Sequence, residues 1–183
     1  MDKQNIEIVW FKRDLRVHDH QPLVQASKYN QVLAIYIFEI ELWRQTDHSY
    51  RHYLFLKEAL KDLEKQLNAI GANLAVFVGS AVDIFEKLYS QYRINNIFSH
   101  QETWNLWTYN RDKAVKSWAR DNNVEWIETP QNGVIRNLSD RNGWSQRWYA
   151  TMSSPLISVP HKIKSVIVRS DNIPEPSLLN LSK

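Results

Sequence analysis

Ile6-Glu7-Ile8-Val9-Trp10-Phe11 is an apolar segment that runs directly into the charged stretch Lys12-Arg13-Asp14-Leu15-Arg16-Val17-His18-Asp19. Its β-branched and aromatic residues predict a buried strand, and the charges that follow predict a turn at the carboxyl end of that strand. A dinucleotide-binding loop needs glycines at this point, because only glycine lets the backbone approach a pyrophosphate. This turn has none, so ordinary NAD binding and a phosphate-binding loop of the Walker type are disfavoured.

Four further short apolar runs follow, and the segments between them have the spacing of helices. The clearest helix, about residues 49–69, repeats apolar side chains at intervals of three and four. Alternation of strands and helices is typical of βαβ units. The sequence therefore predicts an α/β fold, a Rossmann-like doubly wound five-stranded parallel sheet with helices on both faces, which binds ligands at the carboxyl ends of its strands. The later strands are expected at residues 32–38, 73–78, 96–99 and 124–128.

Composition narrows the functional classes. The chain has 183 residues, 43% of them apolar, 23 Lys and Arg against 20 Asp and Glu, and no cysteine. Without cysteine, disulfides, thiolate nucleophiles, Cys-ligated zinc and iron–sulfur clusters are excluded. A net charge of +3 does not by itself indicate nucleic-acid binding. No signal peptide and no apolar run of membrane-spanning length is evident, so we expect a cytoplasmic protein with no membrane partner.

Two other patterns invite a functional interpretation that we do not adopt. His48 and His52 stand one helical turn apart, but no third ligand of zinc spacing accompanies them, so we predict a solvated helix start and no metal. Trp107 and Trp118 are expected on one helix face together with Arg111 and Ala114. An aromatic stripe at helical spacing is more often core than an electron-transfer chain.

The charged turn resembles the opening signature of the DNA photolyase/cryptochrome family, in which the first strand ends in Trp-Phe-Arg-Arg-Asp-Leu-Arg and continues through His-Asp. Lys12 takes one arginine place here. Further matches follow in order at Ser49-Tyr50-Arg51, Arg111-Asp112 and residues 130–134. The family commonly has Asp-Asn-Pro before the first helix, whereas this chain has Asp19-His20-Gln21-Pro22, which leaves the N-cap open between Asp19 and His20.

The resemblance implies a division into parts. Residues 1–160 would form the family's N-terminal α/β domain and residues 161–183 an interdomain linker or tail, while the C-terminal helical FAD-binding domain is absent from the sequence. In the family, the α/β domain holds an antenna pigment, a reduced folate, a deazaflavin or a flavin, and passes excitation to FAD for light-driven DNA repair or signalling. Its expected partner is the FAD-binding domain, with damaged DNA bound through the whole protein. Carbon–carbon lyase activity is not expected of this part alone.

A planar pigment needs aromatic faces for stacking and a few polar groups that fix its orientation. At the strand ends the aromatic candidates are Trp10, Phe11 and Phe38, with Trp104 nearby. By analogy with the family, Arg51 and Glu102 are the first polar candidates, because an arginine can meet an anionic group and a glutamate can accept from a ring N–H. Lys12, Glu39 and Asn105 complete the predicted pigment-binding set, and no catalytic residue is expected. We expect Arg13, Asp14 and Arg16 to hold the loop and the domain interface.

Two other functions remain open. A free-standing nucleotide-binding module of related topology would bind adenine nucleotides, and the missing glycine-rich loop counts against it. A protein-docking module with an empty pocket would bind the helical domain without any pigment. Repair enzyme and photoreceptor are equal interpretations of this domain, because the residues that separate them belong to the other domain.

Overall fold

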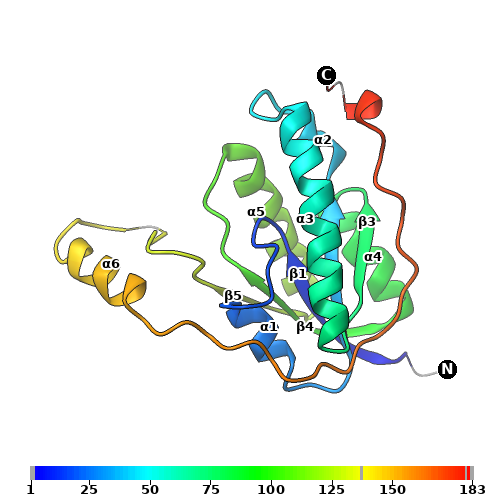
Figure 1. Cartoon of the computed structure of the whole chain (residues 1–183), viewed down its shortest axis with the longest axis horizontal. Coiled ribbons are helices and arrows are strands. Elements are labelled where there is room, and N and C mark those ends of the chain that lie inside the picture. The colour runs from blue at the N-terminus through cyan, green and yellow to red at the C-terminus, as the bar shows by residue number, and fades with distance from the viewer. Residues whose placement is uncertain (1–2, 137, 180, 182–183) are drawn as a thin grey trace.

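The computed structural model describes residues 3–136, 138–179 and 181. The chain alternates strands and helices as the sequence predicts (Figure 1). The elements are, in order, β1 (Asn5–Phe11), α1 (Gln21–Ala26), β2 (Val32–Phe38), α2 (Ile40–Trp43), α3 (Tyr50–Ala69), β3 (Leu74–Val78), α4 (Ala81–Gln91), β4 (Arg93–His100), α5 (Leu106–Asp121), β5 (Glu125–Thr129), α6 (Trp144–Met152) and the 3₁₀ helix η1 (Pro176–Leu179).

The five strands form one parallel sheet in the order β3-β2-β1-β4-β5. The chain builds outward from β1 through β2 to β3, and then returns to the other side of β1 with β4. The order of the strands therefore reverses between β1 and β4, which is where sheets of this type bind ligands. The predicted fold class is confirmed, and the charged turn after β1 lies at this reversal.

Two apolar cores lie on opposite faces of the sheet. Side chains of β1 and β2 alternate between the cores, because successive residues of a strand point to opposite faces. One core joins the sheet to α1 and α3 through residues such as Phe11, Leu23 and Leu60. The other joins it to α4 and α5 through residues such as Trp10, Phe85 and Trp118. Helices on both faces explain why β2 is buried along its whole length.

The start of α1 answers the question that the sequence left open. His20 is the N-cap, and its Nδ1 accepts a hydrogen bond from the backbone N–H of Leu23 at 3.1 Å. Asp19 precedes the cap with a positive φ of 48°, a conformation that Asp tolerates better than most residues. Its side chain accepts from the backbone N–H of Ile157. The open choice of N-cap between Asp19 and His20 is therefore settled in favour of His20.

The segment after residue 160 runs along the β3 edge of the sheet (Figure 1). Ile163, Val166 and Leu179 are buried in the two cores. Asp171 accepts from the backbone N–H of Val78 at 3.1 Å, and its own N–H donates to the carbonyl of Val76 at 2.7 Å. The predicted linker or tail is therefore a strap that covers an otherwise open strand edge, which is a common protection against edge-to-edge pairing.

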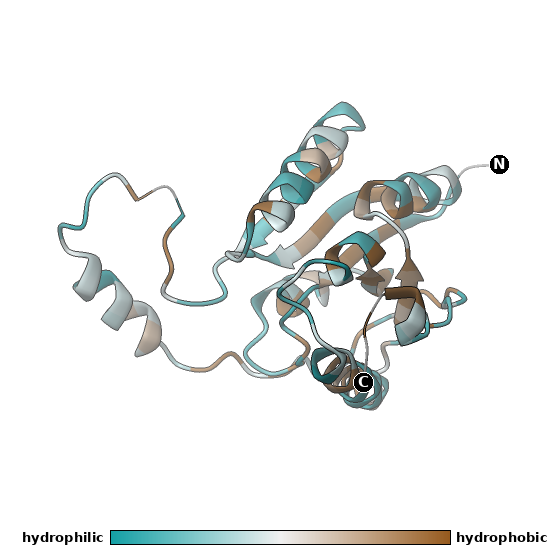
Figure 2. Cartoon of the chain, turned by 90° about the horizontal axis from the view of Figure 1, so that it is seen from above, coloured by the Kyte–Doolittle hydropathy of each residue, from teal (hydrophilic) through white to brown (hydrophobic). Residues whose placement is uncertain are grey.

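Residues 138–156 form an excursion that stands apart from the body in both views (Figures 1 and 2). It carries α6, which buries none of its residues. Trp144, Tyr149 and Met152 on this helix are exposed. None of the helices that the structure describes has both the length and the hydropathy to cross a lipid bilayer.

Two local predictions differ from the structure, and one short helix was not predicted. β4 begins at Arg93, three residues before the predicted start, because the polar residues Arg93 and Asn95 hide its strand pattern; Asn95 and Asn96 both donate to Glu7. α2 has only four residues, too few to show a helical period. The buried face of α5 is turned by one position from the predicted one, and Ala114 is exposed.

Candidate functional site

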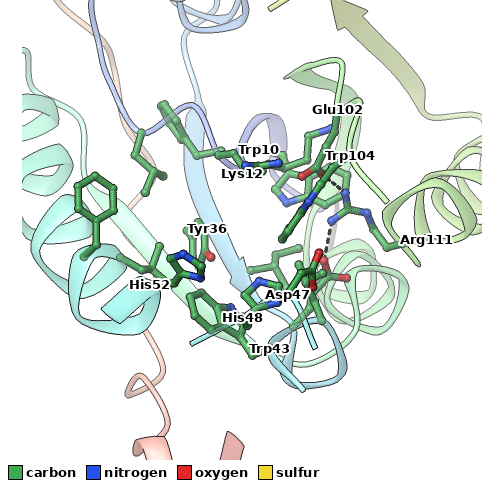
Figure 3. A pocket seen from close by; sticks show the side chains of 18 residues that line it. Trp10, Lys12, Tyr36, Trp43, Asp47, His48, His52, Glu102, Trp104 and Arg111 are labelled. Atoms are coloured by element: carbon green, nitrogen blue, oxygen red, sulfur yellow. Dashed lines mark hydrogen bonds and ion pairs between the residues drawn. The ribbon is translucent and has the colours of Figure 1, made fainter. Parts of the chain in front are cut away.

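A cavity of about 350 Å³ opens at the carboxyl ends of β1, β2 and β4, where the strand order reverses. Its walls are formed by the turn after β1, the residue after β2, helix α2, the first turns of α3, the loop after β4 and helix α5. Trp10, Lys12 and Glu102 lie at one end of the cavity, and Trp43, Asp47 and His48 lie at the other (Figure 3). A volume of this size suits a small organic ligand.

Aromatic rings form much of the wall. Trp43 of α2 lines the cavity and stacks on Phe38 behind it, with ring centroids 5.2 Å apart and an interplanar angle of 12°. On the facing side, the guanidinium carbon of Arg13 lies 4.1 Å from the ring centroid of Trp104. Trp104 is 36% exposed, so this side of the cavity is open to solvent. Indole faces of this kind offer a stacking surface to a planar ligand.

The floor of the cavity is a network of buried charges. Arg111 of α5 donates to Glu39 at 2.6 Å and to Asp112 at 2.8 Å, and it also forms an ion pair with Glu102. Its guanidinium carbon lies 4.8 Å from the ring centroid of Trp10. Arginine suits this place because its planar group carries five donors in a fixed geometry. Arg111 thereby joins Glu39 after β2 and Glu102 after β4 to Asp112 of its own helix.

The charges in this network depend on one another. Burial raises the pKa of Glu39, and the adjacent guanidinium of Arg111 opposes that rise. Burial disfavours the charged form of Arg111, but the charges of Glu39, Glu102 and Asp112 outweigh the effect of burial and raise the pKa of Arg111 above its ordinary value. Removal of the arginine would therefore leave several buried carboxylates without a counterion, a costly arrangement in a region of low dielectric constant.

A second arginine closes the network beside β5. Arg136 donates to both carboxylate oxygens of Glu128, at 3.0 and 2.9 Å, and to the backbone carbonyl of Glu102 at 2.6 Å. These bonds fix the loop that carries Glu102 at the end of β4.

Lys12 differs from its neighbours because its charge has no hydrogen-bonded partner. Its Nζ is buried and forms no hydrogen bond within the described part of the chain. The ammonium lies 4.8 Å from the ring centroid of Trp10 and 5.6 Å from that of Trp126. Burial lowers the pKa of Lys12, and the charge of Asp112 partly offsets that effect. Lys12 lines the cavity with an unpaired buried donor, and Nδ1 of His48 on the same wall is likewise buried without a hydrogen bond among the described residues.

Beneath the turn, Asp14 joins β1 to the start of α1 and the end of β4. Its Oδ2 lies 2.6 Å from Nδ1 of His100 and 2.8 Å from Nε2 of His20, and its Oδ1 accepts from the backbone N–H of Lys12 at 2.9 Å. Burial alone would raise the pKa of Asp14, but the two imidazoles hold it well below its usual range. Burial lowers the pKa of His20, so this ring is held neutral. The three side chains place possible metal ligands within 4.8 Å of one another, but the same atoms already contact each other.

The other end of the cavity carries histidines. His48 is buried against the rings of Trp43 and Trp104, with centroid separations of 4.7 and 5.0 Å, and its Nδ1 lies 3.3 Å from Asp47. Burial lowers the pKa of His48. His52, one turn into α3, lines the same wall. The prediction of a solvated helix start is wrong for His48, because the loop after α2 folds back over the strand ends, whereas His52 is exposed in the first turn of α3 as predicted.

Comparison with known proteins identifies the family of this chain. A family model described as DNA photolyase matches residues 7–152. The chain belongs to the DNA photolyase family. Cryptochrome-1 of Aedes aegypti is 31% identical over 128 residues, which cover 66% of this chain and 23% of that protein. Cryptochrome DASH of Gloeobacter violaceus is 32% identical over 101 residues, which cover 52% of this chain and 20% of the relative. The chain thus spans about a quarter of the length of these photolyase-family relatives.

Solved structures of the family have the same fold. A Synechocystis cryptochrome superimposes with a TM-score of 0.77 at 17% identity, over 97% of this chain and 41% of the other. A bacterial class III photolyase from Agrobacterium tumefaciens gives a TM-score of 0.75 at 22% identity, over 94% of this chain and 38% of the other. Likeness at such identities concerns the fold alone.

The structure brings most of the predicted pigment-binding residues of this photolyase-family domain together. Five of them line the cavity: Trp10, Phe11, Lys12, Glu39 and Glu102. They meet because the carboxyl ends of neighbouring parallel strands lie at one edge of a sheet. Their role in binding a pigment remains a prediction.

The other three predicted residues lie outside the cavity wall. Phe38 is fully buried behind Trp43, which presents its own ring to the cavity instead. Asn105 is the N-cap of α5 and donates to Asp47 at 3.1 Å, so it supports the wall from behind. Arg51 is exposed on the first turn of α3. It could contact only a ligand that extends beyond the cavity.

The three residues expected to hold the turn divide between two places. Asp14 lies in the buried cluster, and Arg16 donates to the carbonyl of Asp19 at 3.0 Å, so both make contacts within the turn. Arg13 lies on the cavity wall over Trp104. A part in a domain interface stays a prediction for all three.

Sequence reasoning did not assign Trp43, Asp47, His48, His52 and Arg111 to the site. Arg111 was visible as part of an Arg-Asp pair that matches the family, but the periodicity of α5 suggested a core position. Trp43 lies on the four-residue helix that no pattern revealed. The signal that was available is the interval between β2 and α3, residues 39–49, which is longer than a tight connection and contains Trp43 and His48.

Proposed function

We propose that this chain is the light-harvesting domain of a photolyase or cryptochrome and that its cavity holds an antenna pigment. The pigment would be a reduced folate, a deazaflavin or a flavin, and it would pass excitation to FAD in a separate helical domain. Repair of DNA or light signalling would then belong to the whole protein, with damaged DNA bound mainly outside this chain.

The observation that carries this proposal is the cavity at the reversal of strand order. Trp43 and Trp104 offer aromatic faces for stacking, and Glu102 lies beside Trp104, at the end of the cavity away from Trp43, as a polar anchor. The charges below are already paired through Arg111, so the cavity floor is rigid before any ligand binds. A preformed site of this kind binds a planar ring without the cost of ordering its walls.

The comparisons give indirect support for a pigment. The family contains both photolyases and cryptochromes, and the printed title of the Sulfolobus tokodaii photolyase structure describes two FAD molecules and a novel light-harvesting cofactor. That statement concerns the other protein, and its structure is 18% identical to this chain. Flavin is for this reason one member of the pigment panel to be tested.

The proposal is tested by titration of the purified chain with a reduced folate, a deazaflavin, FMN and ATP. Pigment spectra and tryptophan fluorescence would report binding, because Trp43 and Trp104 line the cavity. We expect saturable binding of one pigment and none of ATP. Binding of ATP alone would favour the nucleotide-binding alternative, and failure of every pigment would contradict an antenna site formed by this chain.

A second test concerns the division of labour. The chain alone should not repair pyrimidine dimers in light, because the proposed electron donor, FAD, would be bound elsewhere. Robust repair by the isolated chain, measured by recovery of intact thymine, would contradict the proposal.

A further inference from the structure

We propose that the end of the strap, residues 173–179, controls the affinity of the cavity by holding the wall that carries Trp43. Ligand binding and docking of this segment therefore stabilise one another, although none of its residues lines the cavity. The inference rests on the proposed pigment site. It adds a second place of control, on the segment predicted as an interdomain linker or tail.

The wall that carries Trp43 has little stability of its own. Helix α2 has four residues, a single turn, and a helix this short is not stable by itself in water. Glu39, its N-cap, makes no side-chain capping bond. Both carboxylate oxygens of Glu39 are engaged elsewhere, one by Arg111 and one by the backbone N–H of Ala81. The position of Trp43 therefore depends on what packs around α2.

The end of the strap supplies two hydrogen bonds to this wall. The hydroxyl of Tyr53, in the first turn of α3, donates to the carbonyl of Pro174 at 3.0 Å. Arg44, the C-cap of α2, donates to the carbonyl of Leu178 at 3.2 Å, which places η1 beside α2 (Figure 1). Leu179 is 1% exposed and lies in the core that also holds the aromatic side chain of α2. The strap thus contacts α2 and α3 together.

Tyr53 connects the strap to the cavity. Its ring meets that of Trp43 edge to face, with centroids 6.2 Å apart and an interplanar angle of 89°. Trp43 lines the cavity, whereas Tyr53 is 1% exposed and does not line it. Tyr53 is therefore a positioning residue: its hydroxyl is fixed by the carbonyl of Pro174, and its ring supports the indole that would stack on a pigment.

Coupling between the strap and the cavity follows from these contacts. While residues 173–179 are docked, Trp43 is held in place and the cavity is ready for a planar ring. When they leave, α2 loses its support, and a ligand must first restore the wall, which lowers its apparent affinity. Linkage makes the effect reciprocal, because a ligand that needs the wall must favour the docked strap by the same factor.

The first test uses the intact chain and measures the reciprocal effect. Hydrogen–deuterium exchange at residues 173–179 is followed by mass spectrometry with and without a saturating pigment, the tightest binder among a reduced folate, a deazaflavin and FMN. We expect the pigment to slow this exchange at least about threefold, because it stabilises the docked strap. Exchange in α6, which buries none of its residues, should not change. A strap that only covers the sheet would exchange at the same rate in both samples.

Two tyrosine variants separate this coupling from general stability. Tyr53→Phe removes the hydroxyl that binds Pro174 and should weaken pigment binding about two- to fivefold. Tyr89→Phe is the matched control, because the hydroxyl of Tyr89 donates to the backbone carbonyl of Asn122 at 3.2 Å beside the other core. It loses the same kind of hydrogen bond far from the strap and should leave pigment affinity within about 1.5-fold.

Truncation should have a larger effect. A chain ending at residue 172 keeps Asp171 and the part of the strap that pairs with β3, but it loses both hydrogen bonds to the wall and the buried side chain of Leu179. We expect its pigment affinity to fall at least about tenfold. A synthetic peptide of residues 173–183, added in excess, should restore affinity, whereas a scrambled peptide should not. Circular dichroism would verify that the truncated chain is folded.

The outcomes separate this inference from the pigment site. If the wild type binds a pigment but exchange at residues 173–179 stays the same, or if Tyr53→Phe binds as tightly as the wild type, the coupling is refuted and the pigment site stands. An equal loss in Tyr53→Phe and Tyr89→Phe would also refute it, because the effect would then reflect stability alone. If no pigment of the panel binds the wild type, both the inference and the pigment site are wrong.

Discussion

Replacement of Asp14 by Asn should strongly destabilise the fold while hardly changing its shape. One carboxylate oxygen lies 2.6 Å from Nδ1 of His100 and 2.8 Å from Nε2 of His20, and the other accepts a hydrogen bond from the backbone N–H of Lys12. Asparagine keeps the acceptor for Lys12 but turns an amide N–H toward the two imidazoles. His20 cannot become an acceptor there without losing the bond from the N–H of Leu23 that caps α1.

The magnitude follows from the bonds that are lost. A hydrogen bond to a charged group contributes about 1.5–3 kcal/mol, so two imidazole contacts to the carboxylate of Asp14 correspond to about 3–6 kcal/mol. This is a large fraction of the roughly 5–15 kcal/mol that stabilises a typical domain. With a urea dependence of about 2 kcal/mol per molar, the midpoint of unfolding should fall by about 1.5–3 M.

Urea unfolding followed by tryptophan fluorescence measures this loss. Asp62→Asn on the exposed surface of α3 is the matched control and should change stability by less than about 0.5 kcal/mol. A loss below about 1 kcal/mol for Asp14→Asn would refute the view that the Asp14–His20–His100 cluster holds the turn.

Three other predictions follow from the same structure. The unfolding free energy should decline as the pH falls below about 6.5, because burial keeps His20 neutral in the fold while the unfolded chain takes up a proton. It should decline again below about 3.9, where Asp14 is protonated in the unfolded chain but not in the fold. Urea midpoints at several pH values measure both effects, and a flat profile from pH 7 to 5 would contradict the effect of His20. Trp43→Leu should weaken pigment binding about three- to tenfold through the lost stacking surface, whereas Trp144→Leu on α6 should not, as fluorescence titration would report. A chain ending at residue 160 should self-associate and unfold more readily, because the strap no longer covers the β3 edge, and a stable monomer by light scattering would count against that role.

The sequence was sufficient for the fold because strand and helix patterns alternate clearly along it. β2 shows seven buried residues in a row, as a central parallel strand requires, and α3 repeats its buried leucines at helical spacing. α2 and the first residues of β4 were not predicted because neither shows a periodic pattern. Four residues do not define a helical period, and polar side chains at the start of β4 hide the apolar pattern of a strand.

The site was predictable where it depends on strand ends, and not where it depends on a loop that folds back. Lys12, Glu39 and Glu102 directly follow three strands, so the topology brings them together. His48 reaches the cavity only because α2 reverses the chain, and the sequence contains no pattern that measures this reversal. Arg111 was not assigned to the site, because its role depends on Glu39, Glu102 and Asp112, which come together only in the folded chain.

The central claim is that the cavity at the carboxyl ends of β1, β2 and β4 holds a planar pigment. A crystal structure of the chain grown with the pigment that binds most tightly in titration tests it most directly. We expect the ring to lie against Trp43 and Trp104, with its polar edge toward Lys12 and Glu102. A pigment bound elsewhere on the chain, with this cavity empty, would contradict the claim.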